Sequence, residues 1–310
     1  MESGQSNSSK METFRLFDDK PQPGFGLNFL ESPEKPFPPP PPCVEVLPSQ
    51  VSSSVKYTVE TVNLDGITLI KGRVNTKEVF AFSNLDLVPG KYEGGLKLWE
   101  GSLDLVKTLR SEMQDGKLSF SGKRVLELGC GHGLPGIFAC LMGSGVVHFQ
   151  DFNAEVLQSL TIPNVNANIQ KKTNSAGTDV IECITELETR FFAGDWSEVD
   201  AILPYVCGDD CGTNSDQEVA NREGYDVILM AETVYSLYAL PMLYKLIKKC
   251  LNRPHGVVYM AAKKHYFGVG GGSRRFLSFL EKDGVLASTL VAEVADSSSN
   301  LREVWKFHFK

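Results

Sequence analysis

The residues with the clearest chemical potential lie in segment 125–136, which reads V-L-E-L-G-C-G-H-G-L-P-G. An apolar run leads into three glycines at alternate positions, Gly129, Gly131 and Gly133. Glycine lets a backbone approach a ligand closely, so a strand, a glycine turn and a following helix together form a nucleotide-binding corner. A dinucleotide fingerprint would need glycine in place of Leu134, so a pyrophosphate cradle is disfavoured.

Acidic side chains accompany this corner on two neighbouring strands. Glu127 lies near the end of the first strand, where its carboxylate would order the glycine turn or bind an ammonium group of the ligand. Asp151 closes the apolar run 146–151, 20 residues after the middle glycine, a spacing at which a carboxylate accepts hydrogen bonds from ribose hydroxyls. We expect Phe152 to cover an adenine. Asn153 would be a further polar contact or the N-cap of the next helix.

Four further segments combine acids with aromatic side chains. They are 92–100 (Y-E-G-G-L-K-L-W-E), 149–153 (F-Q-D-F-N), 194–196 (G-D-W) and 231–235 (A-E-T-V-Y). The run E-L-G-C-G-H-G resembles motif I of the seven-β-strand methyltransferases that use S-adenosylmethionine, and the resemblance extends over roughly residues 89–310. With the four segments, the chain resembles the histidine protein methyltransferases, eukaryotic enzymes that methylate a histidine of a large-subunit ribosomal protein.

The resemblance implies a cofactor contact for each part of S-adenosylmethionine. The three glycines would lie against the methionine moiety, near a helix start that favours its carboxylate. Asp195 would accept a hydrogen bond from the adenine amino group, and Trp196 would line the base. Trp99 would place its ring over the cofactor, where cation–π attraction favours a sulfonium.

Glu232 and Tyr235 are the expected catalytic pair, because the carboxyl ends of parallel strands line the ligand crevice. Glu232 would accept a hydrogen bond from one ring nitrogen of the substrate histidine while the other attacks the methyl group. Tyr235 would wall the substrate site. A histidine with an ordinary pKa of ~6.5 offers a neutral nitrogen near pH 7, whereas a lysine with an ordinary pKa of ~10.4 must first lose a proton. We expect no metal site, because Cys207 and Cys211 form an isolated pair.

The elements that must position these residues follow an alternating pattern, which predicts an α/β fold with right-handed parallel crossovers. We expect strands at 124–129, 146–151, 190–194, 226–231, 256–262, 285–294 and 302–309, and helices from Trp99 and near 134–142, 154–168, 240–251 and 273–282. The last two strands are joined by a short turn and must be antiparallel. The resemblance implies a doubly wound, mostly parallel seven-stranded sheet of the Rossmann-like type, with one antiparallel strand.

Composition divides the chain into three predicted parts. Residues 1–50 hold ten of the sixteen prolines and predict a disordered, proline-rich tail. Residues 51–95 predict an N-terminal β extension, with strands at 57–62, 67–74 and 79–82, and residues 96–310 predict the catalytic domain. The polar, glycine-rich segment 204–224 predicts a surface loop.

Charge and cysteine usage limit the partners. A net charge of −7 argues against a general nucleic-acid binder. The sequence contains no apolar run of about 18 residues, so we expect no membrane span. Seven cysteines without regular spacing indicate reduced thiols in the cytoplasm and nucleus. The five histidines are expected to be structural or solvated.

The sequence therefore predicts a protein-histidine methyltransferase that takes S-adenosylmethionine and a ribosomal protein substrate, with a proline-binding partner as one role for the tail. Two alternatives stay open. One is a protein-lysine methyltransferase of the same fold, because an acid and an aromatic residue at 232 and 235 serve both reactions. The other is a non-catalytic module that keeps the cofactor site for binding alone.

Overall fold

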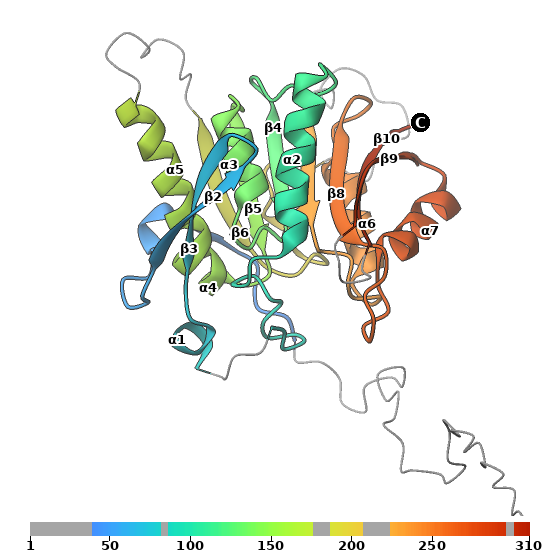
Figure 1. Ribbon diagram of the computed structural model, residues 1–310. Coiled ribbons are helices and arrows are strands. Elements are labelled where there is room, and N and C mark those ends of the chain that lie inside the picture. The colour runs from blue at the N-terminus through green and yellow to red at the C-terminus, as the bar shows by residue number, and fades with distance from the viewer. Residues whose placement is uncertain (1–38, 82–85, 176–186, 207–223, 296–300) are drawn as a thin grey trace, which may run out of the picture. The chain divides into compact units, whose positions relative to one another are not determined.

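The computed structural model describes residues 39–81, 86–175, 187–206, 224–295 and 301–310 (Figure 1). The strands of its main sheet are β1 (Val44–Val46), β4 (Arg124–Leu128), β5 (Val146–Asp151), β6 (Glu188–Ala193), β7 (Val227–Ala231), β8 (Val257–Lys263), β9 (Leu286–Ala295) and β10 (Leu301–Phe309). Their order across the sheet is β1-β6-β5-β4-β7-β8-β10-β9.

The centre of this sheet is parallel. β6, β5, β4, β7 and β8 pair in parallel, while β10 runs antiparallel to both β8 and β9. The predicted mostly parallel seven-stranded sheet with one antiparallel strand is confirmed. β1 adds an eighth strand, antiparallel to β6, at the sheet edge.

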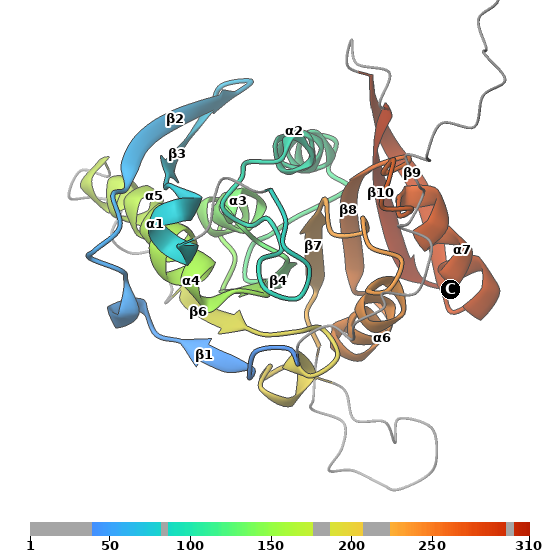
Figure 2. The same cartoon turned by 90° about the horizontal axis from the view of Figure 1, so that it is seen from below.

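Helices lie on both faces of the sheet (Figures 1 and 2). The helices are α1 (Thr76–Phe80), α2 (Glu100–Gln114), α3 (Leu134–Leu141), α4 (Ala154–Val156), α5 (Ile162–Ser175), α6 (Leu240–Cys250) and α7 (Ser273–Asp283). α2, α3 and α5 cover one face, and α6 and α7 cover the other. A π-helical turn, Leu157–Thr161, joins α4 to α5 in one helical run, and short 3-10 helices occupy Pro48–Gln50 and Val199–Ala201.

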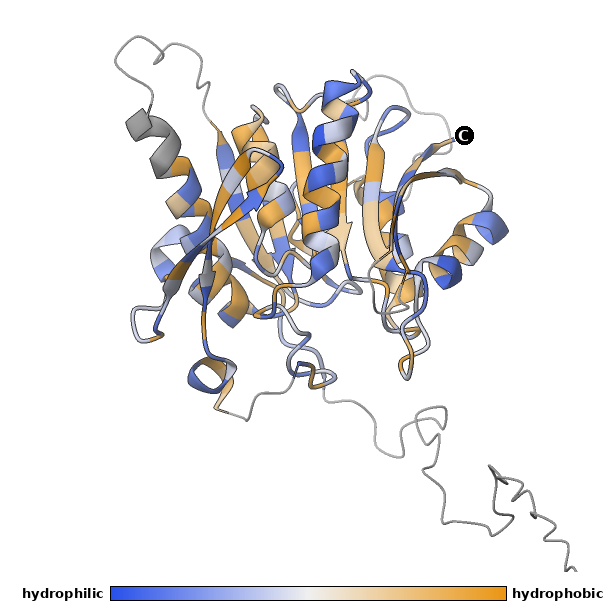
Figure 3. Cartoon of the chain, in the orientation of Figure 1, coloured by the Kyte–Doolittle hydropathy of each residue, from blue (hydrophilic) through white to orange (hydrophobic). Residues whose placement is uncertain are grey.

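On β4 and β8, alternate residues enter different hydrophobic clusters, as a period of two requires. On β4, Val125 belongs to the cluster with α2 and α3, and Leu126 belongs to the cluster with α6 and α7. On β8, Tyr259 and Met260 divide in the same way. Figure 3 shows the hydrophobic residues concentrated on the central strands, with hydrophilic residues along the outer sides of the helices.

A β-hairpin precedes the main sheet, formed by β2 (Thr58–Leu64) and β3 (Ile67–Arg73). Asn168 of α5 holds it in place: its side chain accepts a hydrogen bond from the N–H of Ile70 at 2.9 Å and donates to the carbonyl of Ile70 at 2.7 Å. The prediction of strands at 57–62 and 67–74 is therefore confirmed.

The third strand predicted for this region, at 79–82, is wrong. Residues Thr76–Phe80 form α1 instead, and residue 82 lies outside the described ranges. The Asn75 side chain caps this helix by accepting a hydrogen bond from the N–H of Lys77 at 2.9 Å. An N-cap of this kind favours a helical turn over the alternating pattern of the aromatic residues that follow.

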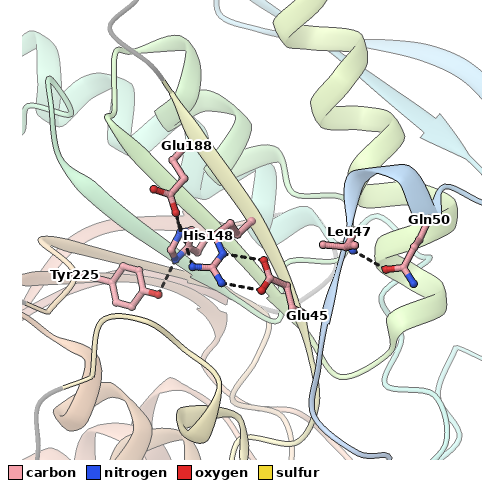
Figure 4. A network of polar contacts seen from close by, with 7 residues as sticks. Glu45, Leu47, Gln50, His148, Glu188 and Tyr225 are labelled. Carbon is pink, nitrogen blue, oxygen red and sulfur yellow. Dashed lines mark hydrogen bonds and ion pairs between the residues drawn. The ribbon is translucent and has the colours of Figure 1, made fainter.

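β1 lies inside the range assigned to a disordered tail, so that prediction is wrong for residues 44–50 and stays a prediction for residues 1–38, which lie outside the described ranges. Glu45 of β1 accepts two hydrogen bonds from Arg190 of β6, at 2.8 and 2.7 Å. Figure 4 shows Glu45 beside a second set of contacts, in which His148 meets Tyr225 at 2.8 Å and Glu188 at 3.2 Å.

Among the described helices, none combines the length and the apolar character that crossing a membrane requires.

Candidate active site

The five parallel strands end at one edge of the sheet, which is the edge viewed from below in Figure 2. The glycine turn follows β4 at this edge. Gly129, Gly131 and Gly133 have φ angles of 60°, 47° and 70°, in the region that favours glycine. A Cβ on Gly131 would lie 2.9 Å from the carbonyl oxygen of Gly95, and one on Gly129 would lie 2.8 Å from Cγ2 of Thr233. Side chains at these positions would therefore collide with neighbouring loops.

Asp151 ends β5 directly beside this turn. Its Oδ2 accepts from the N–H of Gly131 at 2.9 Å, and its Oδ1 accepts from the N–H of Asn153 at 3.1 Å. The residue is 4% exposed, and burial raises the pKa of its carboxyl to about 6, against the opposing effect of these N–H donors. Each carboxylate oxygen can accept more than one hydrogen bond, so Asp151 can also receive a pair of hydroxyl donors.

Glu127 is also buried in this corner, but it faces α3. Its Oε2 accepts from the N–H of Gly136 at 2.8 Å, and burial raises the pKa of its carboxyl well above the ordinary value. Of the two roles predicted for Glu127, this contact supports the ordering of the glycine turn and its helix.

A covering segment, defined here as residues 90–99, lies over the corner. Asn153 hydrogen-bonds to this covering segment: its side chain accepts from the N–H of Glu93 at 3.2 Å and donates to the carbonyl of Lys91 at 2.8 Å. Asn153 precedes α4, but its side chain makes no capping bond, so the capping role is wrong. Phe152, next to it, is partly buried.

The covering segment also brings Trp99 to the site. A Cβ on Gly95 would lie 3.0 Å from Oδ2 of Asp151, so this segment packs directly on the carboxylate. The indole of Trp99 donates to the carbonyl of Gly94 at 3.1 Å, and its ring centroid lies 4.5 Å from Nζ of Lys97. Trp99 is also the residue from which α2 begins.

Trp196 joins the glycine turn through a residue that was not predicted from the sequence. Its indole donates to Oε1 of Gln150 at 2.9 Å, and the same oxygen accepts from the N–H of Gly129 at 3.2 Å. The amide of Gln150 donates to the carbonyl of Gly194 at 2.9 Å, and the side chain is fully buried. In the sequence, Gln150 could have been recognised because it is a polar residue inside an apolar strand.

Asp195 is placed less directly. Its Oδ1 accepts from the N–H and the hydroxyl of Ser197, at 2.8 and 2.6 Å, so its carboxylate closes its own turn. It lies next to Trp196 at the end of β6, which keeps it at the same edge of the sheet.

Four further residues of the site form what we call the acceptor cluster, namely Glu93, Glu232, Tyr235 and Tyr266. Glu232 follows β7 with a φ of 57°, which is uncommon for a residue with a side chain, and is 7% exposed. Its Oε2 accepts from the hydroxyl of Tyr266. Among the residues that the structure describes, nothing hydrogen-bonds to its buried Oε1.

The rings of the two tyrosines of the acceptor cluster lie close to each other. Their centroids lie 6.4 Å apart at an interplanar angle of 67°. The hydroxyl of Tyr235 donates to Oε2 of Glu93 in the covering segment. Both hydroxyls therefore already have acceptors, which leaves Oε1 of Glu232 as an acceptor for an incoming group. Tyr266 and Glu93 were not among the predicted catalytic residues, because neither is near residue 232 in sequence.

Charges around Glu232 act in both directions on its ionisation. Burial raises the pKa of its carboxyl, and the Tyr266 hydrogen bond and the positive charge of Lys263 oppose that rise. The Lys263 ammonium lies 5.8 Å from the ring centroid of Trp99 and 6.0 Å from that of Tyr266. Gly101, at the start of α2, packs directly against Glu232, because a Cβ on Gly101 would lie 2.6 Å from Oε1 of Glu232.

Two buried histidines lie outside the acceptor cluster. His132 reaches the carbonyl of Leu96 through Nε2 at 3.1 Å, and burial lowers its pKa to about 4. Burial also lowers the pKa of His148 to about 4. No cluster of three metal-ligating residues occurs in the described ranges, and Cys207 and Cys211 fall outside them.

Comparison with known proteins adds a second line of argument. A family model described as lysine methyltransferase matches residues 89–207 and 210–283. The chain is 40% identical over 219 residues to the histidine protein methyltransferase 1 homolog of Dictyostelium discoideum, covering 71% of this chain and 59% of that protein. It is 36% identical over 247 residues to the homolog from Rattus norvegicus, covering 74% and 63%.

A more distant relative is named for a different substrate. The chain is 28% identical over 167 residues to EEF1A lysine methyltransferase 3 of Mus musculus, covering 54% of this chain and 55% of that protein. This chain thus spans about three fifths of the length of the histidine protein methyltransferases named above. Because the family model matches more than half of this chain, the predicted resemblance is confirmed and the chain belongs to the lysine methyltransferase family of that model, with histidine protein methyltransferases among its relatives.

Proposed function

We propose that this protein is an S-adenosylmethionine-dependent methyltransferase that transfers a methyl group to a ring nitrogen of a histidine in a protein. The observation that carries the proposal is the buried carboxylate of Glu232, at the sheet edge that also holds the glycine turn: Tyr266 binds its Oε2, and its Oε1 has no hydrogen-bond partner among the described residues. A cofactor corner and an acceptor site on one edge are what a transferase requires.

The residues of the corner fit the proposed cofactor. Gly129 and Gly131 have positive φ angles and pack closely against Thr233 and Gly95, which gives the turn the compact backbone of a nucleotide-binding corner. Thr233 adds a buried hydroxyl with no hydrogen-bond partner among the described residues, next to Gly129. Asp151 would hold the ribose hydroxyls. Trp196 and Phe152 would line the adenine, with Asp195 at its amino group, and Trp99 would lie beside the sulfonium.

The acceptor side would act mainly by positioning. S-adenosylmethionine supplies a methyl group on a sulfonium, so the S–C bond breaks as the N–C bond forms and a neutral thioether leaves. Oε1 of Glu232 would accept a hydrogen bond from one ring N–H of the substrate histidine. This hydrogen bond would direct the lone pair of the other ring nitrogen away from Glu232. The same oxygen would take the proton from the methylated, cationic ring. Tyr235 and Tyr266 would flank the ring.

The hydrogen-bonding capacity of the acceptor cluster favours histidine over lysine. A neutral imidazole carries one N–H donor, which matches the single unpartnered oxygen.

A protein-lysine methyltransferase is the second candidate. The description of the matching family model and the resemblance to EEF1A lysine methyltransferase 3 favour it. An acid and an aromatic ring at residues 232 and 235 would also suit an amine that has lost its proton.

We further propose a large-subunit ribosomal protein as the substrate, and the cytoplasm and nucleus as the place of action. The motifs shared with the histidine protein methyltransferases support the substrate. Residues 1–38 would offer their prolines to a proline-binding partner.

The test is methyl transfer by the purified full chain to ribosomal proteins, using isotopically labelled S-adenosylmethionine and amino-acid analysis of the product. We expect label in methylhistidine, and loss of label with Glu232→Gln although that variant still binds the cofactor. Label in methyllysine would establish the second candidate. Cofactor binding without any transfer would indicate a binding module.

A further inference from the structure

Among the described residues, the carboxylate of Glu232 receives a hydrogen bond from one side chain, that of Tyr266. Tyr266 follows β8, and its hydroxyl donates to Oε2 of Glu232, while the N–H of Lys263 donates to the same hydroxyl at 3.3 Å. The phenol is therefore oriented by the backbone of β8 before it reaches the carboxylate. A second link fixes the loop that carries it, because the N–H of Tyr266 donates to the carbonyl of Gly271 at 3.1 Å.

We propose that Tyr266 is a positioning residue for methyl transfer: it holds Oε2 of Glu232 and so leaves Oε1 as the acceptor for the substrate ring N–H. This inference rests on the proposed function and adds a residue to it. The left-handed φ of Glu232 and the close packing of Gly101 already limit the conformations of the Glu232 side chain. The hydrogen bond from Tyr266 therefore fixes the rotation of the carboxylate that these two constraints leave open.

The same contact keeps the carboxylate in the form that the reaction needs. Only ionised Glu232 can take the proton of the ring N–H, and the ionised form also accepts the hydrogen bond from that N–H more strongly than the neutral form does. The groups that face Glu232 come from four elements: Tyr266 after β8 and Lys263 on β8 favour the ionised form, as does Arg302 of β10, whereas Glu100 of α2 opposes it. Burial opposes it most strongly.

Removing the hydroxyl should therefore have two separate effects. In Tyr266→Phe, the carboxyl of Glu232 loses a hydrogen bond to its charged form, and its titration midpoint should move upward by about one pH unit. The value of kcat should fall about tenfold, because the acceptor is less well oriented and less often ionised. The dissociation constant of S-adenosylhomocysteine should change by less than about twofold, since Tyr266 has no role in the cofactor corner.

Tyr259→Phe is the matched control. Tyr259 is a buried tyrosine of β8 that donates to Oε2 of Glu112 at 2.9 Å, away from the acceptor cluster. This substitution removes the same kind of tyrosine–carboxylate bond from β8, the strand that precedes Tyr266. This variant should leave both the titration of Glu232 and kcat at the wild-type values.

The experiment combines carbon NMR titration of the full chain, labelled at the glutamate carboxyl carbons, with steady-state kinetics. The Glu232 signal is assigned by its absence in Glu232→Gln. An unchanged midpoint in Tyr266→Phe, or an equal loss of kcat in Tyr259→Phe, would overturn the proposal. If the wild-type chain methylates no histidine, the proposed function fails, and the titration still decides whether Tyr266 controls Glu232.

Discussion

Asp151 and Glu232 are both carboxylates withdrawn from water, and their partners separate their roles. Both oxygens of Asp151 accept backbone N–H groups, so its position is fixed by the chain itself. Glu232 has one oxygen bound by Tyr266 and one without a partner among the described residues. A fixed carboxylate suits the binding of a ligand, whereas a carboxylate with a free oxygen suits an acceptor for a substrate proton.

The pKa of Asp151 predicts how cofactor affinity depends on pH. Burial raises this pKa to about 6, so the carboxyl of the free protein is largely protonated at pH 5. Hydroxyl donors bind the ionised form better, so binding must expel the proton below that pH. The dissociation constant of S-adenosylhomocysteine should rise about tenfold for each pH unit below about 6 and stay flat above it. Calorimetry from pH 5 to 8 measures this.

The matched variant is Asp151→Asn, which keeps the shape of the side chain and cannot titrate. It should bind more weakly at pH 8, and its dissociation constant should not vary between pH 5 and 8. The same pH dependence in the variant and the wild type would contradict the assignment of this titration to Asp151.

Replacing Gly101 with alanine should lower kcat, although helix propensity alone would make this substitution favourable. An alanine near the start of α2 should normally stabilise that helix by up to about 1 kcal/mol. Here its Cβ would lie 2.6 Å from Oε1 and 2.9 Å from Cγ of Glu232. Gly101→Ala should therefore cut kcat at least about tenfold while cofactor affinity is retained. In a Glu232→Ala background, Gly101→Ala should not lower Tm, and a fall in Tm there would show that the alanine collides with another group.

At the scale of elements, local patterns predicted what lies next to each motif, and long-range pairing had to come from the structure. The apolar run before Gly129 and the acid at 151 predicted the corner, because both are local to β4 and β5. Tyr266 hydrogen-bonds to Glu232 although the two residues are 34 positions apart in the sequence, and Gln150 and Trp196 are 46 positions apart. Contacts at such separations leave no periodic signal in a single sequence.

Short elements failed for a related reason. β1 has three residues and is held by pairing with β6, so its own sequence carries little strand preference beyond two valines. The third strand expected at 79–82 was wrong because the capping asparagine at 75 sets a helix just before it. Element identity there depends on one capping contact rather than on hydrophobic periodicity.

β1 should be a structural part of the cofactor site. Cys43 precedes it and lies against Gly194, where a Cβ would lie 2.2 Å from its Sγ, beside Asp195 and Trp196. Val46 is buried against the main sheet. Removing residues 1–47 should therefore lower Tm by about 3 °C or more and weaken S-adenosylhomocysteine binding. Thermal unfolding and calorimetry measure both quantities.

Removal of residues 1–38 alone is the control, because it leaves β1 and Cys43 in place. This shorter deletion should keep the Tm and the affinity of the full chain. Equal effects of the two deletions would assign them to the tail rather than to β1.

For the molecule as a whole, buried neutral histidines predict instability in acid. The folded pKa of His148 is about 4, below the unfolded value of about 6.5, so the neutral form carries the stability. That stability is present above pH 6.5 and is lost as the pH falls toward 4. Between pH 7.5 and pH 5 the loss from His148 should be about 2 kcal/mol. Urea unfolding at the two pH values measures it.

His148→Gln isolates this contribution, since glutamine can still hydrogen-bond and does not titrate. The variant should be less stable at pH 7.5, and its stability should fall by about 2 kcal/mol less than that of the wild type on acidification. An identical fall in both proteins would place the acid sensitivity in other groups, such as His132.

The doubly wound fold could be predicted as a whole because apolar strands alternate with helices along the chain, and strands such as β4 and β8 supply both cores. The site could be predicted in part, since its cofactor side is built from consecutive motifs and its acceptor side from distant loops. Glu232 and Tyr235 were found in sequence, and their partners Tyr266 and Glu93 needed the structure.

The central claim is that the edge where β4, β5 and β7 end holds S-adenosylmethionine beside a proton acceptor. Calorimetric titration of the folded full chain with S-adenosylhomocysteine at pH 7.5 tests it most directly, in wild type and in Asp151→Ala. We predict binding of one molecule per chain by the wild type, and at least about a hundredfold weaker binding by the variant. No binding by the folded wild type, or equal binding by both, would contradict the account.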